Sequence, residues 1–295
     1  MGNSSQKQAY IYIFITFFIW GSVYVAGKIA SSDLPSGMVA SLRCVISMAP
    51  LWFLSRKYLP LKIGREDWKY FFLIGFLGYF YTIQSIQLGI SMTGASMASL
   101  VNALTPVAVT IIAVVFLGER ITPVKILCLV LALLGTAVIS SGAATKSEAR
   151  GILVVLSGVV AFAAASVMMR KLTVKYPPVV VTCVSMTVSL LFHIPVGIAS
   201  ALTQPFTVTP KAVAVLLYLG IAGSGLGQVT WTRALSMLPA STCSLFYPLQ
   251  PLFSAVLGAL LLHESFTPAF FIGLVLISLD VVLNTLETGR QAKKQ

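Results

Sequence analysis

Charged residues are scarce in this chain. They make up 9% of its 295 residues, against 57% hydrophobic residues, whereas a soluble domain carries roughly 25% charged residues. Too few polar side chains are present to cover a globule of this size with a solvated surface. The composition excludes an ordinary soluble protein and indicates an all-α integral membrane protein, because helices satisfy their backbone hydrogen bonds internally within lipid.

Side chains suited to metal or thiol chemistry are also few. The chain has two histidines and four cysteines, and no two cysteines have the CxxC spacing of a zinc or redox site. We find no nucleophile paired with a base and no Walker motif, so ATP is not expected as a direct energy source. The sequence therefore predicts no metal, no cofactor and no enzyme.

Acidic residues are outnumbered by basic ones, eight against 20, which gives a formal net charge of +12. In a soluble protein this excess would suggest a nucleic-acid partner. Here the basic residues cluster beside hydrophobic segments, a pattern that belongs to membrane orientation. We expect the lipid bilayer and a small-molecule substrate as partners, and no nucleic acid.

Long apolar segments fill most of the chain, separated by short stretches rich in Ser, Gly and Pro. A helix needs about 20 apolar residues to cross the bilayer core. Ten such segments are predicted, at residues 10–29, 36–55, 69–89, 95–117, 124–141, 151–170, 178–202, 211–233, 240–262 and 268–286. If the N-terminus is cytoplasmic, inner regions hold 15 of the 20 basic residues. Both termini are therefore expected in the cytoplasm.

A repeat joins the two halves of the sequence at a constant offset of 145 residues. The offset pairs Gly75 with Gly220, Pro106 with Pro251 and Glu119 with Glu264 in one ungapped register. The predicted repeats are residues 1–146 and 147–295, with five helices each. Because five is odd, the second half must cross the membrane in the opposite sense. Inverted repeats of this kind are typical of secondary transporters that work by alternating access.

Glu119 and Glu264 occupy equivalent places at the ends of apolar segments, each followed by a Pro four residues later. Two interpretations stay open. Each Glu either marks a helix boundary, stabilised by nearby backbone donors, or takes part in gating or ion coupling.

Three stretches resemble the EamA family of the drug/metabolite transporter superfamily. They are WGSVYVAGKIA with the later SLR (20–30, 41–43), GASMASLVNALTPVAVTIIAVVFLGERIT (94–122) and RALSMLPASTCSLFYPLQPLFSAVLGALLLHESFT (233–267). The resemblance implies ten helices, inverted repeats and movement of amino acids or similar metabolites, often outward, across a bacterial inner or cell membrane. Two departures stand out: His263 replaces the usual Gly, and Ala165-Ser166 replace a Trp-Gly.

Substrate-binding candidates are polar and aromatic residues inside the segments, since such groups are costly against lipid. Asn102 and Thr105 precede Pro106, and Tyr247 and Gln250 occupy the equivalent positions before Pro251. Each pair has i, i+3 spacing, which predicts one shared helix face. These pairs either line a cavity or hold helices together. Further cavity candidates are Trp20, Tyr24, Tyr79, Gln84, Gln87 and Trp231.

Two ionisable side chains complete the set. Arg43 lies within the second segment and either meets a substrate carboxylate or pairs with a structural partner. Asp280, in the last segment, either carries a coupling proton or reaches water at the helix end.

The sequence thus favours a secondary carrier of amino acids or related metabolites, with export as the expected direction. A proton-coupled antiporter of drugs or organic cations is the alternative carrier. A membrane assembly subunit without transport activity is the alternative from a different class.

Overall fold

The structure is a computed structural model, and its described elements are helices joined by loops. The described residues are 3–58, 62–117, 146–237, 243, 246–247 and 249–292, with a few more between 123 and 138. No strand occurs among them.

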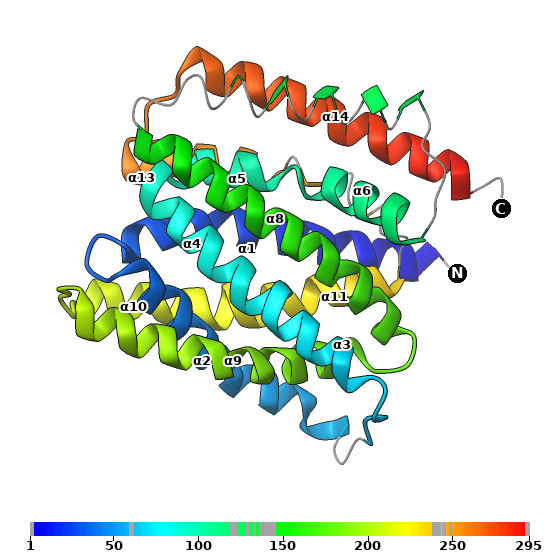
Figure 1. Cartoon of the computed structure of the whole chain (residues 1–295), viewed down its shortest axis with the longest axis horizontal. Helices are drawn as coiled ribbons and strands as arrows, with labels where there is room; N and C mark the ends of the chain where they lie inside the picture. Colours follow the sequence, from blue (N-terminus) through cyan, green and yellow to red (C-terminus); the bar gives the residue numbers. More distant parts are fainter. Residues whose placement is uncertain are drawn as a thin grey trace.

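The first half contains helices α1 to α6, and the second half contains α8 to α14 (Figure 1). The first set is α1 (Asn3–Ala30), α2 (Ser36–Ser55), η1 (Arg56–Tyr58), α3 (Trp68–Leu73), η2 (Ile74–Tyr81), α4 (Thr82–Thr93), α5 (Ala95–Asn102) and α6 (Thr105–Leu117). The second set is α8 (Lys146–Thr173), α9 (Pro178–Thr203), α10 (Pro210–Tyr218), η3 (Leu219–Gly227), α11 (Gln228–Met237), α13 (Leu249–Leu262) and α14 (Pro268–Ala292).

Six helical stretches in the described part are long and apolar enough to cross a membrane. They are Lys7–Ala30, Ser36–Tyr58, Trp68–Thr93, Lys146–Thr173, Pro178–Thr203 and Pro210–Met237. Their starts follow local chemistry: α2 begins directly after Pro35, and α9 begins with Pro178 at its first turn, where the missing N–H of Pro costs nothing. The predicted segment 124–141 lies mostly outside the described residues.

The predicted segment 95–117 is wrong as a single helix. It is divided into α5 and α6 by a turn at Ala103 and Leu104, directly before Pro106. Asn102 therefore ends one helix and Thr105 begins the next, so the two do not share one continuous helix face. The Thr105 hydroxyl instead donates a hydrogen bond to the Asn102 carbonyl (2.6 Å). A Pro that cannot continue the backbone ladder explains a break at this point.

The start of the sixth predicted segment also needs correction. The segment is predicted to begin at residue 151, but α8 begins five residues earlier, at Lys146.

Two π-helical stretches, η2 and η3, begin 145 residues apart, at the offset of the sequence repeat. Their packing is reciprocal: η2 packs against α8 and α9, the first two helices of the second half, whereas η3 packs against α1 and α2, the first two of the first half. Glycines permit this approach. A Cβ on Gly75 would lie 2.7 Å from the Ser185 carbonyl oxygen, and one on Gly220 would lie 3.0 Å from that of Arg43.

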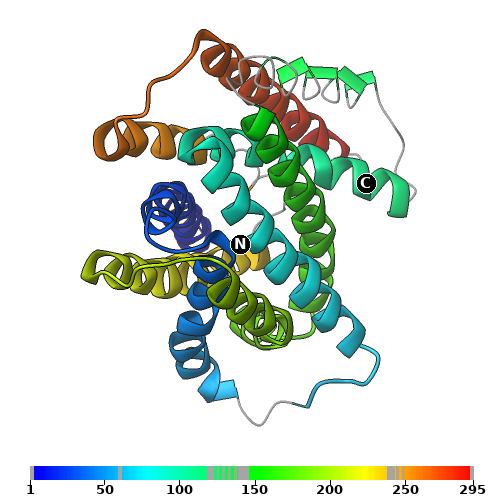
Figure 2. The same ribbon diagram turned by 60° about the vertical axis from the view of Figure 1, so that its left-hand side comes forward.

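The helix α1 runs through the middle of the bundle. It packs against α13, α11 and η3, and Figure 2 shows it flanked by α13 on one side and α10 on the other. The buried apolar cluster around α1 includes Phe17, Trp20 and Tyr24. This position brings one face of α1 against elements from both halves.

The connecting loops meet at two opposite ends of the bundle. At one end, the Thr209 hydroxyl donates to the Asp33 carboxylate (2.6 Å), joining the α1–α2 loop to the α9–α10 loop. At the other end, Lys175 forms an ion pair with Asp67 (2.9 Å), and the Tyr176 hydroxyl donates to the same carboxylate (2.8 Å). These bonds from Lys175 and Tyr176 lower the pKa of Asp67. The first residues of α1 and the last of α14 lie toward one end of the bundle (Figure 1).

Candidate functional site

A small cavity of about 60 Å³ lies between the two halves of the chain. Its wall includes five of the residues that the sequence singled out: Trp20, Tyr24, Arg43, Asn102 and Gln250. The remaining lining residues are Val23, Gly78, Thr82, Ile83, Ile86, Phe162 and Gln228. The first half supplies most of the wall, and Phe162, Gln228 and Gln250 come from the second.

The Asn102 and Gln250 side chains close the cavity between α5 and α13. The Asn102 amide Nδ2 donates to Gln250 Oε1 across the seam (3.2 Å). Both residues sit at a helix end, Asn102 at the end of α5 and Gln250 at the start of α13. The repeat offset thus identified two polar residues that meet in space, and the contact joins the halves directly.

Arg43 reaches the cavity from the middle of α2. The residue is 6% exposed, and its Nε donates to the Ser224 hydroxyl of η3 (2.8 Å). Within the described part of the chain, no carboxylate lies within ion-pair distance of its guanidinium. A Cβ added to Gly223 would lie 3.2 Å from one terminal nitrogen of Arg43. The π-helix η3 therefore supplies both the hydroxyl that orients the side chain and the glycine that leaves room for it.

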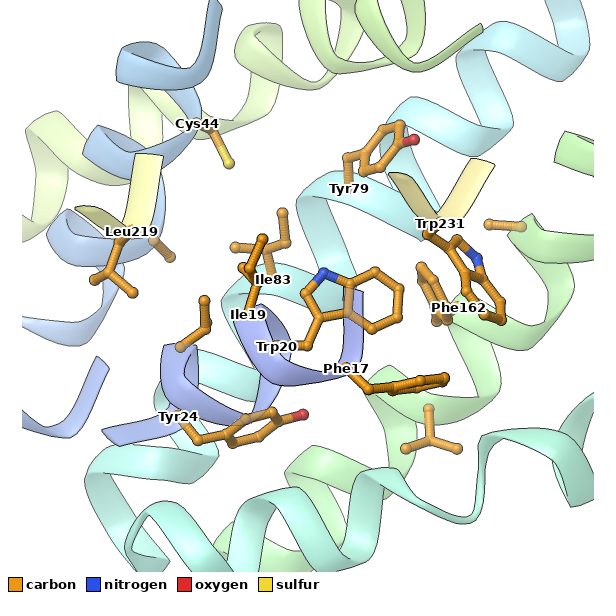
Figure 3. Packing of buried hydrophobic residues seen from close by; sticks show 14 of the residues in the cluster. Phe17, Ile19, Trp20, Tyr24, Cys44, Tyr79, Ile83, Phe162, Leu219 and Trp231 are labelled. Carbon is orange, nitrogen blue, oxygen red and sulfur yellow. The ribbon is translucent and has the colours of Figure 1, made fainter. Parts of the chain in front are cut away.

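An aromatic wall backs the cavity on one side. The Trp20 ring lies edge-on to Phe17 and Phe162 at centroid distances of 6.0 and 6.1 Å, and 5.4 Å from Trp231. Figure 3 shows Trp20 at the centre of this group, with Ile83 beside it and Tyr24 one turn further along α1. Such edge-to-face contacts hold large rings in fixed positions.

Two polar atoms on cavity-lining residues have no hydrogen-bond partner among the described residues. They are the Tyr24 hydroxyl and Gln228 Oε1, both buried. Buried polar groups are nearly always hydrogen-bonded, so unpaired ones at a cavity wall call for an explanation.

Sequence reasoning missed Gln228. Gln84 was chosen although its counterpart at the repeat offset, Val229, is apolar, and Gln228, whose counterpart is Ile83, was not chosen. Gln228 and Ile83 both line the cavity. The signal that could have found Gln228 is its polar side chain inside a predicted apolar segment.

Trp231, Tyr247 and Thr105 lie behind the cavity wall rather than in it. Trp231 and Tyr247 pack edge-to-face at 5.7 Å, and Tyr247 also contacts Phe17 at 4.9 Å. The side chain of Thr105 is occupied by its bond to Asn102.

The polar side chains of Gln84 and Gln87 link helices outside the cavity lining. Gln84 Nε2 donates to the Ser41 hydroxyl (3.1 Å) and lies 3.2 Å from His193 Nδ1, between α2 and α9. Gln87 Nε2 donates to the Gly27 carbonyl of α1 (2.9 Å). Tyr79 is fully buried, and its carbonyl lies 3.3 Å from His193 Nε2.

Glu264 binds the N-terminus of α5, an element of the other half. Its Oε1 accepts from the Ala95 backbone N–H (2.8 Å), and its Oε2 accepts from the N–H and hydroxyl of Ser96. The flanking glycines Gly94, at φ +104°, and Gly258 leave space for the carboxylate. This geometry agrees with the interpretation of Glu264 as a boundary residue held by backbone donors. Glu119 and the side chain of Asp280 lie outside the described residues.

One departure from the family pattern has a local structural reason and the other does not. His263 has φ +53°, the left-handed region that favours the usual Gly, and nothing in the structure explains the His. Ala165 faces Gly78 so closely that a Cβ on that glycine would lie 2.6 Å from the Ala165 Cβ. No room is left there for a Trp ring.

Comparisons with known proteins indicate transporters of one family. The model of the EamA-like transporter family matches residues 7–141 and 149–286. An uncharacterized transporter of Archaeoglobus fulgidus is 29% identical over 93% of this chain and 98% of its own length. A probable terminal-alkyne amino-acid exporter of Streptantibioticus cattleyicolor is 31% identical over 67% of this chain and 66% of its own. A probable amino-acid metabolite efflux pump of Escherichia coli is 22% identical over 90% of this chain and 91% of its own.

A solved crystal structure of another protein has the same fold. It aligns with a TM-score of 0.68 and 18% identity, over 97% of this chain and 99% of the other. With the family match over both halves, the apolar helices of membrane length and the cavity between them, the chain belongs to the EamA-like transporter family and is a multi-pass membrane transporter.

Proposed function

We propose that the chain is a secondary transporter that exports amino acids or related small metabolites by alternating access. The cavity carries this proposal, since it takes Arg43 and Asn102 from one half and Gln228 and Gln250 from the other. A site shared by two halves is exposed to each side of the membrane in turn when one half tilts against the other.

The proposal includes ten crossings in two five-helix repeats, residues 1–146 and 147–295, inserted in opposite senses. The reciprocal packing of η2 and η3 supports this arrangement. Their common offset of 145 residues supports it independently. Two related units inserted in opposite senses have two conformations of similar energy, which is what alternating access requires.

The orientation follows from the basic residues. With both termini in the cytoplasm, the loop that holds Asp67 and the loop that holds Lys175 lie on the inner side. This side carries 15 of the 20 basic residues. The proposed location is a bacterial inner or cell membrane.

The substrate class rests on the relatives and on the cavity together. The relatives from Escherichia coli and Streptantibioticus cattleyicolor are named for the export of amino-acid compounds. The cavity combines hydrogen-bonding side chains with an aromatic wall, which suits a small polar molecule with an apolar part.

An organic-cation antiporter fits the cavity less well, because the buried guanidinium of Arg43 repels a cation. Proton coupling through Asp280 would be revealed if Asp280→Asn abolished proton-linked exchange but left passive flux. An assembly subunit without transport would give no flux at all in liposomes that contain the purified protein.

The direct test is uptake of radiolabelled amino acids, supplied as a panel, into liposomes reconstituted with the purified protein. Asn102→Ala and Gln250→Ala each remove one side of the bond across the seam. A net hydrogen bond is worth about 0.5–1.5 kcal/mol, so each variant is expected to lower flux by roughly two- to tenfold.

The control is Gln204→Ala, at the exposed end of α9 away from the cavity, which is expected to keep wild-type flux. Melting temperatures in detergent establish that all variants are folded. Wild-type flux in both cavity variants would contradict the assigned site, and no flux of any amino acid in the wild type would contradict the substrate class.

A further inference from the structure

The guanidinium of Arg43 lacks an internal counter-ion in the described part of the chain. Arginine has five N–H donors and stays protonated in proteins. Its one hydrogen bond to a described side chain uses Nε, to the Ser224 hydroxyl, and the side chain lines the cavity. The terminal nitrogens of Arg43 are therefore available to a molecule in the cavity.

A buried cation without a partner is costly, and ionisable groups inside membrane helices are a mark of function. The geometry of a guanidinium matches a carboxylate, which accepts two parallel hydrogen bonds from it. A substrate carboxylate would thus supply the missing charge. The cavity differs in this respect from the Gln84 and Gln87 contacts. There, each side-chain amide nitrogen already donates a hydrogen bond to a protein group.

The size of the cavity limits what binds beside Arg43. Its volume of about 60 Å³ holds roughly four to six water-sized groups, at about 10–15 Å³ for each. An α-amino-acid head group has five heavy atoms: the nitrogen, the α-carbon and the three atoms of the carboxylate. The head group fills a space of this size.

Acceptors for an ammonium group line the same cavity. Gln228 Oε1 and the Tyr24 hydroxyl are buried without partners among the described residues, and an ammonium group has three N–H donors to offer them. The Trp20 ring, also in the wall, attracts a cation through its π face. Ile83, Ile86 and Phe162 supply the apolar part of the wall.

From these contacts, and resting on the proposed transport of amino-acid compounds, we infer that the cavity binds an α-amino carboxylate in one fixed polarity. Arg43 holds the carboxylate, and Gln228 with Tyr24 holds the ammonium group. Gln228 is a specificity-determining residue, because it selects amino acids over carboxylic acids that lack the amine.

The first experiment compares ligands on the wild-type protein and so needs no mutation. Each of the twenty L-amino acids is added to the purified protein, and thermal stabilisation is measured. Every amino acid that stabilises the protein is then compared with its amide, which lacks the carboxylate, and with its deaminated acid, which lacks the amine. Both analogues are expected to bind at least tenfold more weakly than the amino acid.

The second experiment tests which residue binds the carboxylate and which binds the ammonium group. Arg43→Gln is expected to lower affinity for the amino acid at least tenfold and to remove the preference over the amide. Arg43→Lys keeps the charge and is expected to retain part of the affinity. Gln228→Leu is expected to remove the preference over the deaminated acid while leaving the preference over the amide.

The matched control is Arg56→Gln, which removes an exposed arginine from the end of the same helical stretch and is expected to bind as the wild type does. If amino acids are transported but their amides bind equally well, the inferred polarity is overturned while the proposed function stands. If no amino acid binds or is transported, both fail. Should the Arg43 variants not fold, the ligand comparison on the wild type still decides the question.

Discussion

Asp67 shows how a single side chain ties the two halves together outside the membrane. It is 6% exposed, it sits just before α3, and it receives bonds from Lys175 and Tyr176 in the loop between α8 and α9. The bond from Lys175, followed by that from Tyr176, holds the pKa of Asp67 below its usual value near 3.8. The ionised form is therefore the one that the folded state favours.

The pH dependence of this contact has a definite sign. Because the folded-state pKa is lowered, the stabilisation is present at neutral pH and is lost as the pH falls below about 4. Asp67→Asn is expected to lower the melting temperature in detergent at pH 7. The difference from the wild type should stay nearly constant from pH 7 to about 4 and shrink as the pH falls further.

The control for this prediction is Glu66→Gln, at the exposed neighbouring position, which should change the melting temperature little at either pH. A difference between Asp67→Asn and the wild type that stayed constant as the pH fell from about 4 to about 2 would contradict the linkage.

Single residues also mark where sequence reasoning succeeded and where it stopped. The repeat offset directed attention to Asn102 and Gln250, and the structure brings them into contact. Composition could not decide which neighbours Gln84 and Gln87 bond to, because an amide in a helix serves a cavity or another helix equally well. That choice depends on helix rotation, which the apolar pattern fixes poorly when lipid and the core are both apolar.

At the level of helices, α5 of the first half is hydrogen-bonded at both of its ends to residues in or next to α13 of the second half. The start of α5 is bound by Glu264, beyond the end of α13, and the end of α5 is bound to Gln250, near the start of α13. A carboxylate suits the first place because a helix N-terminus presents unpaired N–H groups and a partial positive charge.

Glu264→Gln tests the cap. The change removes the charge and leaves one acceptor oxygen, so we expect a loss of about 0.5–2 kcal/mol of stability. The measurement is the melting temperature in detergent, with Glu66→Gln as the control at an exposed loop position. An unchanged melting temperature in Glu264→Gln would show that the bonds to Ala95 and Ser96 contribute nothing.

The π-helices are held by close contacts that leave no room for a methyl group. A Cβ on Gly75 would lie 2.7 Å from a backbone oxygen of α9, and backbone cannot move aside as a side chain can. Gly75→Ala is expected to cost about 1–3 kcal/mol, as overpacking of a tight contact does.

Gly64→Ala is the matched control for Gly75→Ala, since its new Cβ would lie 3.4 Å from its nearest neighbour, an ordinary contact. Equal melting temperatures for the two alanine variants would contradict the close approach of η2 and α9.

Helix boundaries were predicted well where the chemistry is local. The start of α2 after Pro35 and of α9 at Pro178 matches the sequence signals. The break between α5 and α6 was not predicted as a break, because a Pro inside a membrane helix is often tolerated when neighbouring groups satisfy the freed carbonyl. Here the Thr105 hydroxyl bonds the Asn102 carbonyl, a detail that spacing alone does not reveal.

Across the whole molecule, two related halves meet around one cavity. The family model matches each half separately, and each π-helix packs against the first two helices of the other half. The sequence repeat predicted this relation because Pro and Glu residues align between the halves at one offset. Apolar residues are too common in both halves to define an offset. It did not predict the polarity of the cavity, which arises from side chains without equivalents in the other half, Arg43 and Gln228.

Opposite insertion of the two halves is tested most directly by labelling two equivalent, exposed positions that lie 145 residues apart, Glu66 just before α3 and Lys211 in the first turn of α10. Glu66→Cys and Lys211→Cys are each introduced into a chain whose four cysteines have been replaced, and intact cells are treated with a membrane-impermeant maleimide. We expect Lys211→Cys to be labelled from outside, and Glu66→Cys to be labelled only after the membrane is opened. Labelling of both positions from the same side would contradict the account.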